Sequence, residues 1–222
     1  KKNGNFCPQN FSKIAKKEQV KMIEIKISQG AKPGHGGMLL APKVTKEIAE
    51  TRGISIGEDC ISPSKHKEFS NPNQLIDFVN KLRKLSGNKP VGIKMCVGHP
   101  WELVSIVKTM FLKKEYVDFI TIDGAEGGTG AAPAEFTDHL GSPLKDAIVF
   151  VDNALVGSNL RERVKIGVSG KIVSAFDIAH MCSLGADWIN MARPFMFSIG
   201  CIQCRSCHTG ECPTGIATMD PM

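Results

Sequence analysis

Thiol groups are concentrated near the C-terminal end, where four of the eight cysteines lie within twelve residues. Their spacing is Cys201-x2-Cys204-x2-Cys207-x4-Cys212, and Pro213 follows the last one. No secretory feature indicates a disulfide scaffold, and zinc would favour two separated pairs of ligands over four in one loop. Closely spaced thiolates ending in Cys-Pro are typical of iron–sulfur ligation. We therefore expect an iron–sulfur cluster here, with zinc as the alternative.

Two glycine-rich loops are the next candidates for chemistry. The stretch SQGAKPGHGG (28–37) carries Gln29 and Lys32 among four glycines, and DGAEGGTGAAP (123–133) carries paired glycines and a hydroxyl. Glycine lets a backbone approach a ligand and present its N–H groups. Asp123 and Glu126 argue against a bare phosphate pocket, because like charges repel. We expect contacts to a ring system or a polar substrate, the alternative for the first loop being a merely flexible segment.

Charged side chains also lie in or just after strand-like runs. Lys26 and Lys94 interrupt apolar runs, where a charge is costly unless it is paired. Alternation places Glu24 and Lys26 on the same side, which predicts a polar lumen or, alternatively, an exposed edge strand. Lys171 and Arg193 follow the last two strand-like runs, and the last loops of a barrel commonly bind phosphate. They are therefore candidate phosphate ligands, with a solvated or carboxylate-paired role as the alternative.

The elements that must position these residues indicate an α/β fold. Short β-branched runs alternate with longer amphipathic runs, as in βα units around a parallel sheet. Thr45 and Asn71 are expected helix caps, and Pro72 suits the first helical position. The expected strands are 22–28, 91–97, 117–123, 164–169 and 187–192, and the expected helices are 43–52, 72–86, 100–114, one within 143–162, and 174–185.

Such units suit either an open doubly wound sheet or part of a (β/α)8 barrel. Glycine-rich or charged loops after the strands, without an early dinucleotide-binding turn, favour the barrel. We predict the C-terminal part of a (β/α)8 barrel with a cysteine-rich cluster loop after the last strand. Residues 1–20 are expected to be irregular and 21–222 to form one domain. Because the chain starts at Lys1, we expect a piece of a longer protein.

Composition narrows the classes of function. Hydrophobic residues make up 42% and charged residues 23%, which is ordinary for a globular protein, and no window approaches a membrane span. The net charge is +6, but no basic run is interleaved with aromatic residues, so no nucleic-acid partner is expected. A cytoplasmic location is expected.

Several long motifs in order carry a family resemblance. They are EIKISQGAKPGHGG, CISPSKH, VGIKMCVGHPWE, DGAEGGTGAAP, VSGKIVSAFDIA, LGADWINMAR and GCIQCRSCHTGECPTGIAT. From about Lys21 to Met222 the chain resembles the FMN-binding synthase domain of glutamate synthase, specifically its stand-alone relatives. The resemblance implies FMN at the mouth of a (β/α)8 barrel and a three-iron cluster (3Fe-4S) close to it.

The resemblance also implies roles for individual residues. Lys26, Gln29 and Lys32 would face the carboxylates of 2-oxoglutarate. The cluster ligands would be Cys201, Cys207 and Cys212, with Cys204 either a bystander or the fourth ligand of a four-iron cluster (4Fe-4S). Around FMN would lie Lys94, Gly127, Gly128, Thr129, Gly170, Lys171, Ala192 and Arg193.

The reaction implied by the family joins 2-oxoglutarate and ammonia to an imine, which FMN reduces to glutamate. Electrons would arrive through the cluster from ferredoxin or an NAD(P)H-oxidising subunit, and a homo-oligomer is compatible with the resemblance. His35 stands where the large enzymes have Glu, and SGK (169–171) stands where they have DGQ, so substrate contacts there do not transfer. The alternatives are a related enzyme with another substrate, such as an amine joined to glutamate, or a non-catalytic electron-transfer module.

Overall fold

A five-stranded parallel sheet forms the centre of the computed structural model, which describes residues 5–128 and 132–218. The strand order is β1-β4-β5-β6-β7, and every neighbouring pair is parallel. Each strand lies within one of the five predicted ranges, so the predicted α/β fold with a parallel sheet is confirmed. The strands are β1 (Ile23–Lys26), β4 (Val91–Met95), β5 (Phe119–Asp123), β6 (Lys165–Ser169) and β7 (Trp188–Asn190).

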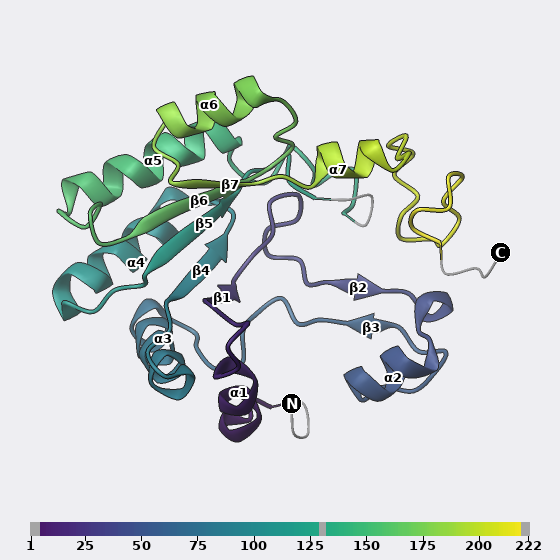
Figure 1. The fold of residues 1–222 in the computed structure, drawn as a ribbon, viewed down its shortest axis with the longest axis horizontal. Helices are drawn as coiled ribbons and strands as arrows, with labels where there is room; N and C mark the ends of the chain where they lie inside the picture. The colour runs from purple at the N-terminus through teal and green to yellow at the C-terminus, as the bar shows by residue number, and fades with distance from the viewer. Residues whose placement is uncertain (1–4, 129–131, 219–222) are drawn as a thin grey trace.

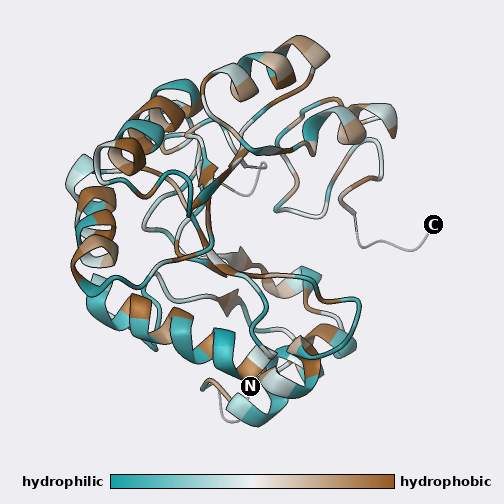
Figure 2. Ribbon diagram, turned by 60° about the vertical axis from the view of Figure 1, so that its left-hand side comes forward, coloured by the Kyte–Doolittle hydropathy of each residue, from teal (hydrophilic) through white to brown (hydrophobic). Residues whose placement is uncertain are grey.

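Helices connect the strands and lie on one side of the sheet. The ribbon forms an open arc, with α3 to α6 along its convex side, as Figure 1 and Figure 2 show. The opposite face of the sheet therefore looks into the arc. These helices are α3 (Pro72–Ser86), α4 (Pro100–Lys113), α5 (Leu144–Gly157) and α6 (Ala175–Ser183), whereas α2 (Lys46–Arg52) lies apart from them on the other side of the molecule.

Capping side chains set the predicted helix starts. Asn71 Oδ1 accepts a hydrogen bond from the Gln74 amide at 3.0 Å, and Pro72 takes the first position of α3. Thr45 Oγ1 accepts a hydrogen bond from the Ile48 amide at 3.3 Å, at the start of α2. These bonds satisfy amides that the first turn of a helix leaves without an internal partner. Both predicted caps are confirmed.

The hydrophobic core lies between the sheet and its helices. Ile93, Ile120 and Ile166 come from the three central strands and are fully buried. Burying one such side chain contributes about 2 kcal/mol to stability. Neighbouring side chains of a strand point to opposite faces, so the residues directly before and after each of these isoleucines point into the arc.

Aromatic rings fill part of the inner face. Phe119 and Trp188 meet edge to face, with 5.4 Å between ring centroids. A Cβ atom added to Gly92 would lie 2.3 Å from the Phe119 ring, and one added to Gly167 would lie 2.3 Å from the Trp188 ring. Each ring thus occupies the space that a glycine leaves, which lets two large side chains fit inside the curved sheet.

The N-terminal segment corrects a prediction. Residues 1–20 were expected to be irregular, but Pro8–Ala15 form helix α1. Eight residues are too few for a helix that is stable alone, so contacts distant in sequence must hold it. Ser12 Oγ donates a hydrogen bond to the Leu85 carbonyl at 2.8 Å, and Lys89 Nζ donates one to the Ala15 carbonyl at 2.6 Å.

Four further short elements were not predicted. With two to six residues each, they carry too little periodicity to be recognised. Because η1 precedes it, α2 begins at Lys46 and not at residue 43 as predicted. The four elements are β2 (Met38–Leu39), which pairs antiparallel with β3 (Cys60–Ile61), η1 (Ala41–Lys43) and α7 (Arg193–Ser198).

Among the described residues, no helix combines the length and the apolar character that crossing a membrane requires.

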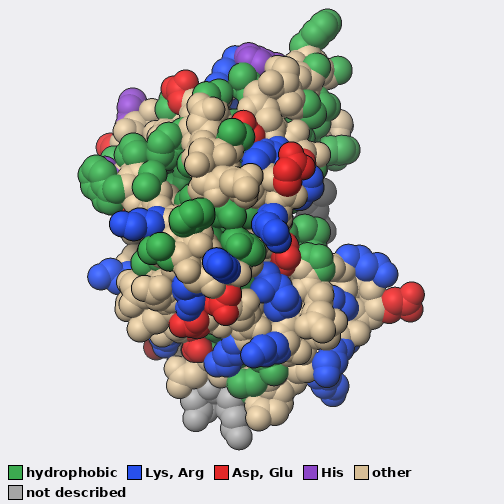
Figure 3. Space-filling view, turned by 90° about the vertical axis from the view of Figure 1, so that its left-hand side faces the viewer, with side chains coloured by type: hydrophobic (Ala, Val, Ile, Leu, Met, Phe, Trp, Pro, Cys, Tyr) green, Lys and Arg blue, Asp and Glu red, His purple; other side chains and the backbone are tan. Residues whose placement is uncertain are grey.

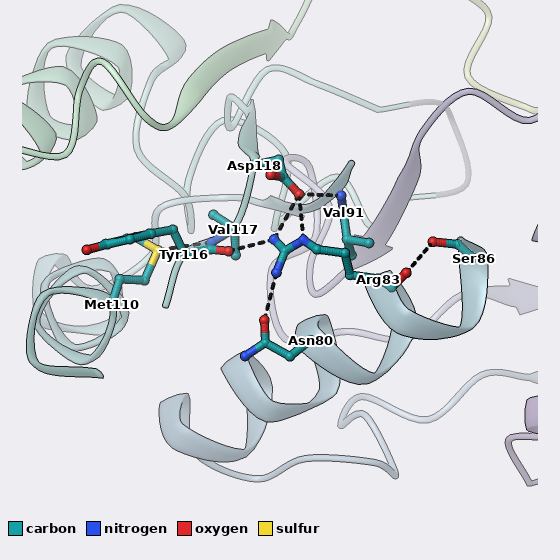
Figure 4. A network of polar contacts seen from close by, with 8 residues as sticks. All are labelled: Asn80, Arg83, Ser86, Val91, Met110, Tyr116, Val117 and Asp118. Atoms are coloured by element: carbon teal, nitrogen blue, oxygen red, sulfur yellow. Dashed lines mark hydrogen bonds and ion pairs between the residues drawn. The ribbon is translucent and has the colours of Figure 1, made fainter. Parts of the chain in front are cut away.

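A polar network fastens α3 to the amino ends of β4 and β5. Asp118 Oδ2 accepts hydrogen bonds from the Val91 amide at 2.7 Å and from Arg83 Nη2 at 2.8 Å. The same guanidinium donates to the Tyr116 carbonyl and to Asn80 Oδ1, both at 2.7 Å (Figure 4). One carboxylate therefore serves a strand and a helix together.

We expect Arg83→Met to lower the free energy of unfolding by about 1–2 kcal/mol, because charge-assisted hydrogen bonds are lost at a partly solvent-screened site. Urea unfolding followed by circular dichroism measures the change. The control is Arg52→Met at the exposed end of α2, which should stay within about 0.5 kcal/mol of the parent. Equal stabilities of the two variants would contradict a stabilising role for the network.

Candidate functional site

The carboxylate of Asp123 joins three segments at the carboxyl end of the sheet. Its Oδ2 accepts a hydrogen bond from the Gly30 amide at 2.9 Å and lies 3.5 Å from Lys94 Nζ. Its Oδ1 accepts a hydrogen bond from Ser169 Oγ at 2.6 Å. Asp123 is 4% exposed, so this charge is stabilised by protein partners more than by water. The loops after β1 and β5 and the ends of β4 and β6 are thereby held together.

The two predicted glycine-rich loops contact each other directly. The Ala31 amide donates a hydrogen bond to the Gly127 carbonyl at 2.5 Å. A Cβ atom on Gly30 would lie 1.8 Å from the Gly124 carbonyl oxygen, so residue 30 has to be glycine for the loops to meet. Gly30 is therefore required for the packing of the two loops and not for contact with a ligand. A ligand could still be contacted by the other residues of the loops.

The three residues predicted to bind substrate lie close to one another. Lys26 Nζ donates a hydrogen bond to Gln29 Oε1 at 3.1 Å. Lys32 is 5% exposed, and burial together with the positive charge of Lys26 lowers its pKa. The register also places Lys26 beside Lys94 on β4. Cationic groups therefore gather at the end of β1, where they favour an anionic ligand.

Three of the predicted cofactor residues, Lys94, Lys171 and Arg193, lie beside the loop after β5 or the end of β5 itself. Arg193 Nη2 donates a hydrogen bond to the Gly128 carbonyl at 3.0 Å, and Lys171 Nζ lies 3.3 Å from Asp138 Oδ2. Lys94 contacts Asp123, the last residue of β5, so basic side chains from three other segments lie against this loop or the strand end before it. Gly127 is buried, Gly128 and Gly170 are half-buried, Ala192 is exposed just before α7, and Thr129 lies outside the described residues.

Sequence reasoning missed several polar contacts of the site. Ser169 was not singled out, and Asp123 was considered only as a charge that disfavours phosphate. Strand alternation was the available signal, because Thr121 and Asp123 share a face with Lys94 of the neighbouring strand. Glu126, like Asp123, was considered only as a charge that disfavours phosphate. Its carboxylate accepts a hydrogen bond from the Leu144 amide, 3.1 Å from either oxygen, and so occupies the N-terminus of α5.

The cysteine segment follows α7 and packs near η1. Lys43 Nζ donates hydrogen bonds to the Cys207 carbonyl and, at 3.0 Å, to the Ala217 carbonyl. Hydrogen bonds from the Thr214 hydroxyl and nearby backbone amides lower the pKa of the Cys212 thiol to about 6. All four cysteines are free, and Cys204 is exposed. Within the described ranges, no group of three or more Cys, His, Asp or Glu side chains is placed to hold a metal ion.

Comparison with known proteins identifies the family. The family described as "Conserved region in glutamate synthase" matches residues 14–222. This chain belongs to the glutamate synthase family. It is 45% identical to the glutamate synthase large subunit-like protein YerD of Bacillus subtilis (strain 168), over 100% of this chain and 42% of YerD. It is 39% identical to an archaeal-type glutamate synthase (NADPH) of Thermotoga neapolitana, over 90% of this chain and 39% of that protein.

The family extends to ferredoxin-dependent glutamate synthase of Antithamnion sp., with 34% identity over 89% of this chain and 13% of that protein. The chain thus spans less than half the length of each of these glutamate synthase relatives. Among solved structures, a flavocytochrome b2 double mutant with pyruvate bound matches with a TM-score of 0.51 and 15% identity, over 94% of this chain and 44% of that chain. The likeness concerns the fold, and with the parallel sheet it confirms the predicted partial (β/α)8 barrel.

We expect Asp123→Asn to lower the free energy of unfolding by about 2–4 kcal/mol, because Lys94 would keep its charge in a mostly buried position. Chemical denaturation measures the loss. The double variant Asp123→Asn/Lys94→Met removes both charges and should recover part of it. If the double variant is no more stable than the single one, the ion pair is not the source of the effect.

Cys96 should resist alkylation in this glutamate synthase fold. Burial and the negative charge of Asp123 raise the pKa of its thiol to about 11. At pH 8 only about one thiol in a thousand is then ionised, and reactivity should increase as the pH approaches 11. Iodoacetamide labelling of the folded chain, followed by peptide mass spectrometry, tests this, with the exposed Cys182 as the reactive control. Equal labelling of both thiols at pH 8 would contradict the placement of Cys96.

Proposed function

We propose that this chain forms part of a glutamate synthase-type oxidoreductase, which makes glutamate from 2-oxoglutarate and ammonia with FMN and an iron–sulfur cluster. Family membership supports the class of reaction, since the relatives carry the names glutamate synthase (NADPH) and ferredoxin-dependent glutamate synthase. The electron donor would accordingly be ferredoxin or an NAD(P)H-oxidising partner.

The observation that carries the proposal is the cationic group at the end of β1. Burial and the charge of Lys26 both disfavour the charged form of Lys32, as the lowered pKa of Lys32 shows. A dicarboxylate placed between these side chains would relieve the repulsion and accept charge-assisted hydrogen bonds. Gln29 adds an amide group that can donate to a second oxygen. These are the properties that binding of 2-oxoglutarate requires.

The residues around the loop after β5 fit FMN in type. A flavin needs cations for its phosphate and polar groups beside its ring system, and Lys171 and Arg193 supply the former. Lys94, oriented by Asp123, would face the ring system, and the backbone of Gly127, Gly128 and Gly170 would border it. When bound, FMN would supply hydride transfer to the substrate carbon. Thr129 and Ala192 complete the set that we propose.

The cysteine segment fits an iron–sulfur cluster by the chemistry of its donors. Cys201, Cys207 and Cys212 would be the ligands, and Cys204 would be a fourth ligand if four irons are bound. The lowered pKa of Cys212 favours the thiolate that a metal requires.

The experiment begins with anaerobic purification of the full-length protein, followed by assays of released FMN, iron and acid-labile sulfide. Reduced flavin should be reoxidised by 2-oxoglutarate with ammonia. Lys32→Met should raise the KM for 2-oxoglutarate by about 10-fold or more, because a charged hydrogen bond is lost, while bound FMN is unchanged. Lys46→Met, an exposed lysine on α2, is the matched control.

Three outcomes would contradict the proposal. Failure of 2-oxoglutarate and ammonia to reoxidise bound FMN would exclude glutamate formation and favour another 2-oxo acid or amine. Zinc without flavin would exclude the redox chemistry altogether. Metal and sulfide without flavin would leave an electron-transfer module.

A further inference from the structure

Lys43 contacts both ends of a loop in the cysteine segment. Its Nζ donates hydrogen bonds to the Cys207 carbonyl and, at 3.0 Å, to the Ala217 carbonyl. Between these two ends, the Lys43 Cε atom lies 3.5 Å from the position that a Cβ atom on Gly210 would take. The 207–217 loop, as we call this segment, therefore turns around one lysine side chain.

The hydrogen bonds of Lys43 join parts of the chain that are far apart in sequence. They connect η1 to residues 164 and 174 positions further on. The other hydrogen bonds that described residues make in the 207–217 loop are local, such as that from Thr209 Oγ1 to the Ser206 carbonyl at 2.9 Å. Local bonds shape a turn but do not place it on the rest of the molecule. Figure 1 shows the C-terminal segment, in yellow, on the side of the molecule that carries β2.

The charge of Lys43 is not neutralised by a carboxylate. On the helix-covered side of the molecule, Lys and Arg side chains lie among Asp and Glu side chains (Figure 3), and Lys113, for example, is paired with Asp77. Within the part of the chain that the structure describes, Lys43 forms no such ion pair, and its partners are two carbonyl groups. Lys43 is half-buried, so this positive charge can stabilise a further negative charge placed beside it.

The cysteine segment itself supplies groups of the opposite charge. Cys207 and Cys212, two of the three proposed cluster ligands, belong to the 207–217 loop, and cysteine binds metal as the negatively charged thiolate. The net charge and the hydrogen bonds around an iron–sulfur cluster are among the factors that set its reduction potential. A positive charge held at the backbone of a ligand residue favours the reduced cluster, because reduction adds negative charge.

We propose that Lys43 is a positioning residue for the iron–sulfur site. It holds the 207–217 loop against η1, and its charge raises the reduction potential of the bound cluster. This inference rests on the proposed function, because it concerns the proposed cluster. Since η1 belongs to the same connection between β1 and α3 as Gln29 and Lys32, one stretch of chain carries both the proposed substrate contacts and this contact to the cysteines.

Hydrogen–deuterium exchange of the anaerobically purified full-length protein tests the positioning role. Lys43→Met should increase amide exchange in peptides covering 207–217 by about 10-fold or more, because both long-range hydrogen bonds are lost. Lys43→Arg keeps a charged donor and should retain most of the protection. The matched control is Lys46→Met, which removes an exposed lysine three positions away and should leave the exchange unchanged.

A potentiometric titration with dithionite as the reductant, followed by electron paramagnetic resonance, tests the role of the charge. The reduction potential of the cluster should be lower in Lys43→Met than in the parent protein, whereas Lys43→Arg and Lys46→Met should keep the parent value. If Lys43→Met binds too little iron for the titration, Lys43→Gln, a neutral donor, takes its place. A purely structural contact would not order the potentials by charge.

The two measurements can each overturn the inference. Unchanged exchange in Lys43→Met would exclude the positioning role, and an unchanged potential would exclude the role of the charge. A parent protein without iron would refute the proposed cluster, and with it the effect on its potential. The exchange measurement would then still decide whether Lys43 holds the 207–217 loop, so failure of the proposed function and failure of this inference are distinguishable.

Discussion

The arrangement of the loops at the carboxyl end of the sheet depends on one buried negative charge, the carboxylate of Asp123. A carboxylate without water is tolerated only when its oxygens are paired or hydrogen-bonded, and here the partners come from three separate segments. Separating any of these segments would remove either a hydrogen bond or the ion pair from the buried carboxylate. The lysines at the end of β1 and the loop after β5 therefore keep a defined relation to each other, although about a hundred residues separate them in the chain.

The regular elements could be predicted because their signals are local. The α3 helix begins with Asn71 and Pro72, and its capping bond involves residues three positions apart. The strands were recognised from β-branched runs bounded by loops. In contrast, α1 is held by Leu85 and Lys89, more than seventy residues away, and the sequence of α1 itself does not indicate these partners. Distance along the chain therefore limited the prediction of α1, whereas shortness limited the prediction of β2, β3, η1 and α7.

The site shows the same division. Lys94 was predicted to need a partner because it interrupts an apolar strand. Its partner, Asp123, could not be predicted, because it depends on how neighbouring strands align in the sheet. The cysteine spacing indicated the donor type without indicating where the segment lies. Its contact with Lys43 joins residues 164 positions apart, so only the folded chain reveals that the cysteine segment rests beside η1.

The aromatic rings on the inner face limit which residues the facing glycine positions of this sheet can carry. Phe119 lies over Gly92 and Trp188 lies over Gly167, and in each case the ring fills the volume of an absent side chain. A larger residue at either glycine is compatible with the sheet only after the facing ring has become smaller. We therefore expect a larger residue at Gly92 or Gly167 to destabilise the sheet unless the facing ring is replaced by a smaller side chain.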